Sequence, residues 1–210
     1  MGQCLCGLVR PSRWTTEVLI LQHPMESGHA KGTGWLLSRC LPRSKLMLGE
    51  RWDEALLRQS LHGAWTAGEA PPEFGGTALL YPSVDASPGV PWDGASAPRR
   101  LVVLDATWRK SLKMLLLNPM LAELPRISLQ PGALSAYAIR RAHRPHQLSS
   151  LEATHLALSQ LHPGQEDLAL DEAMSAFVQA QRVWWPHARG QGEEPGGGPA
   201  PRPPGGPQAR

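Results

Sequence analysis

The sequence predicts an α/β domain in which helices flank a mainly parallel sheet. Short aliphatic runs alternate with longer amphipathic segments from about residue 16 to residue 183, which is typical of a parallel sheet covered on both faces. The run from Leu101 to Leu104 is apolar at every position, as a central parallel strand should be. A length of 210 residues favours one core with appendages.

Strands are expected where short aliphatic runs end at turn residues, at 16–21, 77–81, 100–104, 126–129 and 137–139. The first run ends at His23-Pro24 and the second at Pro82, because the residue before a proline is held in extended geometry. The last two runs lie on either side of a turn at Pro131-Gly132. These five segments supply the strands of the predicted sheet.

Helices are expected at residues 34–41, 52–61, 108–121, 149–161 and 171–183. Pro42 stops the first of them. Apolar residues at 108, 112, 115, 116 and 120 form a helical stripe in the third. Ser149 and Glu152 have the spacing of a capping box, which predicts the start of the fourth.

The last 21 residues are rich in Gly and Pro and have no periodic apolar pattern. Such a segment cannot bury enough apolar surface to offset the entropy of ordering it. We therefore expect one domain at residues 1–189 and a disordered tail at residues 190–210.

No apolar run approaches the roughly 18 to 20 residues that a membrane-spanning helix needs. The first residues also lack the basic region and the long apolar segment of a signal peptide. We expect a soluble, cytoplasmic protein that does not bind membranes. Three cysteines cannot form a disulfide framework, so disulfides are not expected.

Basic residues concentrate in the middle of the chain. Residues 99–146 contain nine Lys or Arg and two acidic residues, although the whole chain has a formal charge of only +3. A basic belt of this kind favours a polyanionic partner such as RNA, since binding phosphates releases counterions. A solvated surface with no partner would show the same pattern, and the charge does not decide between the two.

Three expected strand ends carry polar residues suited to a ligand site: 22–26, 80–83 and 104–108. Ligands of parallel α/β sheets bind beyond the carboxyl ends of the strands. Thr33-Gly34, at a helix start, lies close to the first of these ends in the sequence. We expect these segments to meet at one edge of the sheet.

Asp105 is the leading candidate for chemistry, because it follows four aliphatic residues within the most basic region. Two interpretations stay open. It caps the next helix by accepting the amides of Thr107 or Trp108, or it has a catalytic or ligand role at a strand end where burial is low. Trp108 is more typical of a core residue than of a stacking platform. For Ser149 and Glu152, capping is the commoner explanation.

The segment Leu104-Asp105-Ala106-Thr107-Trp108-Arg109-Lys110 resembles the D-x-T-W signature of the DTW-domain family. Further segments resemble the family and occur in the same order along the chain. They are residues 21–26, 33–34, 80–82, 117–119, 124–125, 135–140 and 147–153, and the resemblance covers about residues 4–186. The signature alone is weak, whereas the ordered set is specific.

The resemblance implies a tRNA-uridine aminocarboxypropyltransferase. Such an enzyme moves the 3-amino-3-carboxypropyl group of S-adenosylmethionine to N3 of a tRNA uridine and releases methylthioadenosine. The resemblance also implies a knotted fold related to the SPOUT methyltransferases. The chain is most similar to bacterial-type members, which act on uridine 47 of the variable loop. The oligomeric state is not predicted.

The resemblance, together with the strand ends, assigns roles to residues. Asp105 is the catalytic candidate, as the base that takes the uridine N3 proton or as the group that orients N3. The candidates for binding S-adenosylmethionine are Thr33, Gly34, Leu80, Tyr81, Pro82, Thr107, Trp108, Tyr137, Ser149 and Glu152. The candidates for binding tRNA phosphates are Arg109, Lys110, Arg140, Arg141 and Arg144.

Members of the family usually open with a C-x-x-C pair upstream of a C-x-C pair, a set of thiolates suited to zinc. This sequence has only the second pair, Cys4-Leu5-Cys6, so we expect no bound metal. Cys40 lies on a helix pattern and is expected to be a core thiol.

Three rival functions are open. A SPOUT-like RNA methyltransferase would use the same donor but attack its methyl carbon. A non-catalytic relative would bind tRNA and release no methylthioadenosine, although the intact Asp105, Thr107 and Trp108 argue against lost catalysis. A domain whose basic belt contacts only protein would show no salt-dependent RNA binding.

Overall fold

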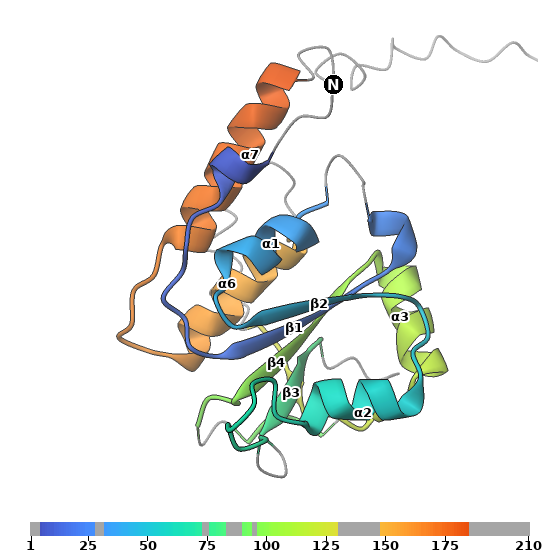
Figure 1. The fold of residues 1–210 in the computed structure, drawn as a ribbon. Helices are drawn as coiled ribbons and strands as arrows, with labels where there is room; N and C mark the ends of the chain where they lie inside the picture. The colour runs from blue at the N-terminus through green and yellow to red at the C-terminus, as the bar shows by residue number, and fades with distance from the viewer. Residues whose placement is uncertain are drawn as a thin grey trace, which may run out of the picture.

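A computed structural model describes residues 5–27, 32–72, 76–82, 90–93, 96–129 and 148–184 of the chain. Figure 1 shows a central sheet with helices on both faces. The expected strand at 137–139 and the expected tail at 190–210 lie outside the described residues.

The sheet has five described strands: β1 (Glu17–Gln22), β2 (Ser44–Leu48), β3 (Thr77–Leu80), β4 (Arg100–Asp105) and β5 (Arg126–Ile127). Their order is β2-β1-β4-β3-β5, and every pair of neighbours is parallel. The prediction of a mainly parallel sheet is therefore confirmed. Because all strands run the same way, their carboxyl ends meet at one edge.

Helices cover both faces. They are α1 (Gly34–Cys40), α2 (Glu54–His62), α3 (Trp108–Leu117), α4 (Pro119–Ala122), α6 (Ser150–Leu161) and α7 (Ala169–Trp184), with short 3-10 turns η1 (Cys6–Leu8) and η2 (Pro24–Glu26). In Figure 1, α1, α6 and α7 lie on one face, and α2 and α3 lie on the other.

Two apolar clusters follow from the alternation of side chains along β1 and β4. Val18 and Ile20 pack with α1, α6 and α7, whereas Leu19 and Leu21 pack with α2 and α3. All six residues of β1 are buried. Cys40 of α1 belongs to the first cluster, where burial raises the pKa of its thiol, so the expected core thiol is confirmed.

Sequence analysis missed the strand β2. It pairs with β1 alone, so it is an edge strand, and its residues are half-buried or exposed. Edge strands have short and weak apolar patterns. The apolar run here has only three residues, Leu46 to Leu48, and it ends at Gly49. Such a short run does not distinguish a strand from the loop after Pro42.

The expected helix at 108–121 is two helices. Pro119 cannot continue α3, and Asn118 ends it. The Asn118 side chain donates to the carbonyls of Met114 and Glu50 at 2.7 and 2.9 Å and accepts from the Trp52 amide at 3.1 Å. This amide therefore joins the end of α3 to the loop between β2 and α2.

The apolar stripe predicted for this helix does not face the core as a whole. Met114 and Leu115 are buried, but Trp108, Leu112 and Leu116 are exposed by 60%, 47% and 74%. The helix is apolar on two sides, and the sheet covers only one of them. The fourth helix begins as predicted, since Ser149 and Glu152 form the capping box at the start of α6.

The amino ends of β1 and β4 are joined by buried charges. Glu17 accepts from Arg100 at 2.5 and 2.9 Å and from Arg43 at 2.6 Å. Arg100 also donates to the carbonyls of Ser60 and Gly63, so all three of its nitrogens have partners. Burial alone would raise the pKa of Glu17, but the hydrogen bonds from Arg43 and Arg100 outweigh it and lower that pKa.

Candidate active site

The polar strand ends predicted from the sequence meet at the carboxyl edge of the sheet. In the register of β1 and β4, Gln22 lies opposite Asp105. The amide of His23 donates to the carbonyl of Asp105 at 3.1 Å, which holds the two ends together. Tyr81 follows β3, the other neighbour of β4. The expected juxtaposition of the three strand ends is confirmed.

The Asp105 carboxylate is held by two neutral donors. Gln22 Nε2 donates to Oδ2 at 2.7 Å, and Ser150 Oγ donates to Oδ1 at 2.5 Å. Gln22 comes from β1 and Ser150 from the first turn of α6, so two elements far apart in sequence fix one carboxylate. Ser150 was not among the predicted site residues, because nothing in the sequence places α6 over β4.

Two expectations for Asp105 are wrong. Its exposed fraction is only 6%, so burial at this strand end is not low. Asp105 also does not cap α3. The N-cap of α3 is Thr107, and the Asp105 side chain turns instead toward β1 and α6. The helices α1 and α6 cover this end of the strand, which explains both corrections.

Gly34 makes room for this carboxylate. A Cβ added at Gly34 would lie 2.3 Å from Asp105 Oδ2 and 2.8 Å from Gln22 Nε2, closer than a Cβ atom approaches another heavy atom in real structures. The backbone at the start of α1 therefore approaches Asp105 as only glycine allows. Thr33, the N-cap of α1, is buried beside it and makes no capping hydrogen bond through its side chain.

Within the described part of the chain, Asp105 has no ion pair. Its partners orient the carboxylate without neutralising its charge. Glu17 at the opposite edge is, by contrast, bonded to two guanidinium groups. A buried carboxylate with neutral partners is suited to accept a proton or a hydrogen bond from a substrate.

Trp108 lies at the surface, three residues after Asp105, at the start of α3. With 60% of its area exposed, it is not the core residue that its type favours. Its ring meets that of Tyr81 edge-on, with centroids 5.9 Å apart. Tyr81 is buried, and its hydroxyl lies 3.5 Å from Ser111 Oγ. The Trp108 ring is thus supported from within and is free to stack on a planar ligand.

The other donor-binding candidates differ in position. Leu80 packs against the core, and Pro82 is half-buried directly after Tyr81. Ser149 and Glu152 bond each other's backbone amides, as capping requires. Thr107 is exposed, and Tyr137 lies outside the described residues.

The RNA-binding candidates are only partly described. Arg109 is exposed at the start of α3. Lys110 makes an ion pair with Glu26 at 2.7 Å, which neutralises part of its charge. Arg140, Arg141 and Arg144 lie outside the described residues.

A second polar cluster, which sequence analysis did not single out, adjoins the site. His23 Nε2 lies 3.0 Å from Glu50 Oε1, and Lys113 Nζ lies 2.9 Å from Glu50 Oε2. Hydrogen bonds from Lys113 and His23 lower the pKa of Glu50. His23 Nδ1 also accepts the Met25 amide at 3.1 Å, so both ring nitrogens are engaged. The cluster fixes the loop after β1 against the one after β2.

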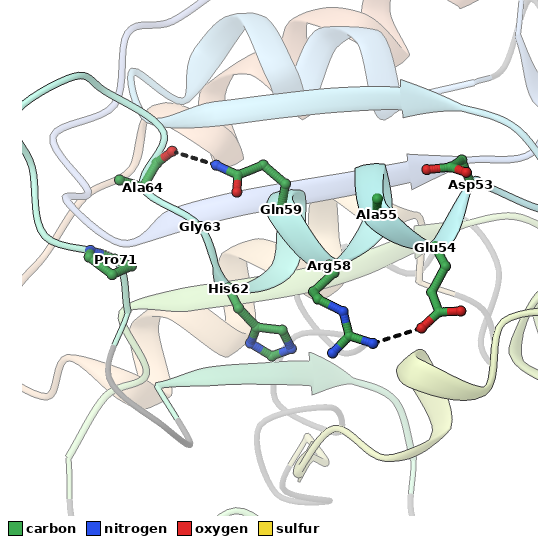
Figure 2. A pocket seen from close by; sticks show the side chains of 9 residues that line it. All are labelled: Asp53, Glu54, Ala55, Arg58, Gln59, His62, Gly63, Ala64 and Pro71. Carbon is green, nitrogen blue, oxygen red and sulfur yellow. Dashed lines mark hydrogen bonds and ion pairs between the residues drawn. The ribbon is translucent and has the colours of Figure 1, made fainter.

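A pocket along α2 is separate from this edge. Figure 2 shows its lining, in which Arg58 faces Glu54 and Gln59 reaches the Ala64 carbonyl. Asp53 caps α2 by accepting the Leu56 amide at 3.0 Å. None of the predicted site residues lines this pocket. Its Arg58 and Glu54 side chains pair with each other, whereas Asp53 and Gln59 bond backbone groups.

The described residues contain no group of three or more His, Cys, Asp or Glu placed to hold a metal ion. Cys6 is exposed, and Cys4 is outside the described part. No helix in the same part of the chain is long and apolar enough to cross a bilayer.

A family model described as the DTW domain matches residues 1–182. The chain belongs to the DTW-domain family. Asp105, Thr107 and Trp108 carry the family's signature, and they lie where β4 passes into α3. No solved structure matches the chain.

Named relatives point to one activity. The chain is 29% identical over 162 residues to tRNA-uridine aminocarboxypropyltransferase 2 of Mus musculus. This alignment covers 74% of this chain and 52% of that protein. It is 28% identical to the Drosophila melanogaster protein of the same name, over 72% of this chain and 58% of that protein. It is 33% identical to tRNA-uridine aminocarboxypropyltransferase A of Arabidopsis thaliana, over 53% of this chain and 45% of that protein. The chain thus spans about half the length of the curated relatives it matches.

Proposed function

We propose that this protein is a tRNA-uridine aminocarboxypropyltransferase that uses S-adenosylmethionine as the donor. The observation that carries the proposal is the Asp105 carboxylate, which is buried, is held by Gln22 and Ser150, and has no ion-pair partner among the described residues. The names of the relatives support the same activity.

The reaction is an in-line displacement. Uridine N3 forms a bond to the γ-carbon of the donor's methionine part, and the bond from that carbon to sulfur breaks. The electron pair passes to sulfur, so the sulfonium charge disappears and methylthioadenosine leaves. The N3 proton is lost to a base. Because the charges of nucleophile and sulfonium cancel, alignment and exclusion of water supply most of the acceleration.

Asp105 faces N3 in this proposal. Gln22 and Ser150 leave each carboxylate oxygen with lone pairs for a further donor, which is what an N3–H group offers. Asp105 then takes the proton directly or orients N3 while water takes it. Its fixed position favours either role, since the carboxylate does not have to reorganise.

The residues around Asp105 fit the donor's chemistry. Trp108 presents a supported, exposed ring to the adenine or to the target base. Glycine at position 34 lets the backbone of α1 come close to the reacting groups. Arg109 and the three arginines at 140, 141 and 144 supply cations for tRNA phosphates.

The finer features of the resemblance belong to this proposal. They are the SPOUT relation and its knot, the bacterial-type target uridine 47, and transfer to N3. The parallel sheet with helices on both faces is compatible with the SPOUT relation, and the knot stays a prediction. Cytoplasmic location stays a prediction from the sequence.

The decisive experiment incubates the purified protein with labelled S-adenosylmethionine and unmodified tRNA and analyses the nucleosides by mass. We expect 3-amino-3-carboxypropyluridine and an equal amount of methylthioadenosine. A methylated nucleoside with S-adenosylhomocysteine would support a methyltransferase instead. Binding of tRNA with no product would support a non-catalytic relative.

A further inference from the structure

Trp35 is an exposed tryptophan beside the candidate active site that the proposed mechanism does not use. It is the second residue of α1 and is 37% exposed, whereas its neighbours Gly34, Leu36 and Leu37 are buried. Tryptophan is highly buried on average in folded proteins, so a ring left open to solvent stands out. On the outer side of a helix, such a ring is available to a ligand that stacks.

Gly34 fixes how close Trp35 is to the Asp105 carboxylate. A Cβ added at Gly34 would lie 2.3 Å from Asp105 Oδ2, so the backbone of α1 lies against the carboxylate one residue before Trp35. Consecutive Cα atoms are only about 3.8 Å apart. A base on the Trp35 ring and a uridine at Asp105 are therefore close enough to be neighbouring nucleotides of one RNA strand.

Trp35 belongs to the same face of the sheet as the Asp105 side chain. That carboxylate accepts from Ser150 at the start of α6, and α1 and α6 lie together on one face (Figure 1). Trp108, which is also exposed, begins α3 on the opposite face. Of these two exposed tryptophans, Trp35 is thus the one on the side to which the carboxylate turns.

Arg39 supplies a positive charge beside the Trp35 ring. It follows one helical turn later, and its guanidinium carbon lies over the indole, 5.5 Å from the ring centroid. Arg39 is exposed and makes no ion pair with another described residue. Contact with a ring face leaves its N–H groups, which point outward in the guanidinium plane, available for hydrogen bonds. The two residues offer a planar surface and an unneutralised cation on one ridge of α1.

We propose that Trp35 and Arg39 bind the tRNA nucleotide next to the uridine that enters the site. This inference rests on the proposed function. A base that leaves the helical stack can stack on an indole ring or on a guanidinium plane, and arginine also bonds the phosphate that each nucleotide carries. Trp35 thereby holds the strand beside the target uridine while Asp105 faces its N3.

Charge favours RNA over the adenine of the donor as the ligand of this ridge. S-adenosylmethionine carries a sulfonium and an ammonium group against a single carboxylate, so it is a cation overall. The helix α1 contains no acidic residue, and the Arg39 charge disfavours a cationic ligand. A nucleotide within a strand brings a negative phosphate to the same place.

The first test measures tRNA affinity by filter binding and donor affinity by calorimetry, with a melting temperature for each variant. Trp35→Ala should weaken tRNA binding about 5- to 100-fold, as expected for one lost base stack. Trp35→Phe keeps a ring and should stay within about threefold of wild type. Arg39→Met should weaken tRNA binding and reduce the slope of log affinity against log salt by about one. All three should bind S-adenosylmethionine as wild type does.

Leu56→Ala and Arg58→Met are the matched controls, because both residues are exposed on α2, on the opposite face of the sheet. Neither should change the affinity for tRNA or for the donor. Arg58→Met removes one positive charge, as Arg39→Met does, so a loss that reflects only the overall charge of the protein would appear in both.

Abasic tRNA locates the contact. Two transcripts are made, each lacking the base on one side of the uridine that the wild-type protein modifies. Wild type should bind one of them more weakly by the factor lost in Trp35→Ala, and that variant should lose nothing further on the same transcript. Such a double-mutant cycle separates a direct stack from a general loss of RNA affinity.

Four results would overturn the inference. A lower melting temperature with tRNA and donor weakened equally would make Trp35 structural. A loss of donor affinity with unchanged tRNA affinity would assign its ring to the adenine. Losses that add on both abasic transcripts would place Trp35 away from the neighbouring nucleotides. Wild-type tRNA affinity in a Trp35→Ala protein that still transfers would reject the inference alone.

The proposed function fails in a different way. Wild-type protein that binds tRNA through Trp35 but forms no product would reject the transferase activity and keep Trp35 as an RNA contact. Wild-type protein that binds no tRNA would reject both.

Discussion

The two ends of the sheet use the same kinds of charged residue in opposite ways. At the amino end, Glu17 and Arg100 bond each other and are both fully buried. At the carboxyl end, Asp105 is almost as buried, yet its hydrogen-bond partners among the described residues, Gln22 and Ser150, are both neutral.

We infer that the paired charges at the amino end stabilise the fold, whereas the carboxylate at the carboxyl end serves the proposed function. Charges that neutralise each other inside the fold hold strands together and are unavailable to a ligand. Charges that are buried without neutralisation weaken the fold and strengthen binding when a ligand of opposite charge or a proton donor arrives. The arrangement predicts that substitutions at the two ends affect different measurements.

Asp105→Asn should have the largest effect, on turnover alone. The substitution removes the charge and keeps the shape, and the Gln22 amide can rotate to accept from the new NH₂ group. We expect transfer to fall about 10²- to 10⁴-fold, as when a general base or a proton-orienting group is lost, with donor affinity and melting temperature nearly unchanged. Release of methylthioadenosine measures transfer, and calorimetry measures the donor affinity and the melting temperature.

Asp105→Ala makes a useful second variant because it leaves Gln22 and Ser150 without an acceptor. Its free energy of unfolding should fall by about 1–3 kcal/mol. Near-normal turnover in Asp105→Asn would show that Asp105 neither takes the proton nor orients N3.

Glu17→Gln should act on stability alone. It leaves Arg100 and Arg43 without their shared carboxylate, and Arg100 is fully buried. Breaking one side of a buried ion pair costs about 3–5 kcal/mol, which denaturant titration will measure. Turnover per folded molecule, assayed well below the melting temperature, should match that of wild type. A loss of turnover in protein shown to be folded would contradict the division between the two ends.

Gly34→Ala tests the crowding around Asp105. Its Cβ would lie 2.3 Å from Asp105 Oδ2, so the carboxylate or the start of α1 must move. We expect a loss of about 1–3 kcal/mol in unfolding free energy, typical of overpacking, and at least a tenfold loss of turnover. Gly7→Ala is the matched control, because a Cβ there meets no atom within 4 Å. If Gly34→Ala were as active as Gly7→Ala, the close approach would have no role in positioning Asp105.

His62→Gln should have the smallest effect, confined to pH dependence at the amino end. Partial desolvation of the exposed His62 ring, then the charges of Arg100 and Arg58, lower the pKa of His62 from 6.5. The unfolded chain therefore binds this proton more readily than the fold, and stability falls as pH drops below about 6.5. Melting temperatures at pH 7.5 and 5.5 should differ less in His62→Gln than in wild type. His162, whose pKa burial also lowers, should account for part of the remaining difference. Equal pH dependence in the two proteins would contradict the depressed pKa of His62.

The sequence was sufficient to predict the interior of the sheet and the meeting of its polar strand ends at one edge. β1, β3 and β4 are strongly aliphatic, and their polar ends follow directly in the chain, so both could be recognised from local pattern. Edge strand β2 escaped because an exposed strand needs no apolar alternation. The exposure of Trp108 escaped because residue type alone favours burial.

The contacts of the site depended on tertiary structure. Ser150 reaches Asp105 across 45 residues of sequence, and the capping box that identified its helix gives no hint of where that helix packs.

Under the proposed function, the contacts of Asp105 also decide when the growing chain becomes competent during synthesis. Its carboxylate needs Gln22 from the first strand, room at Gly34, and the hydroxyl of Ser150. The ribosome delivers the last of these only after more than two thirds of the chain has emerged. A nascent chain that has completed the five described strands still lacks the group that fixes one oxygen of the carboxylate. Truncated products ending before α6 would carry the family signature and remain inert toward tRNA.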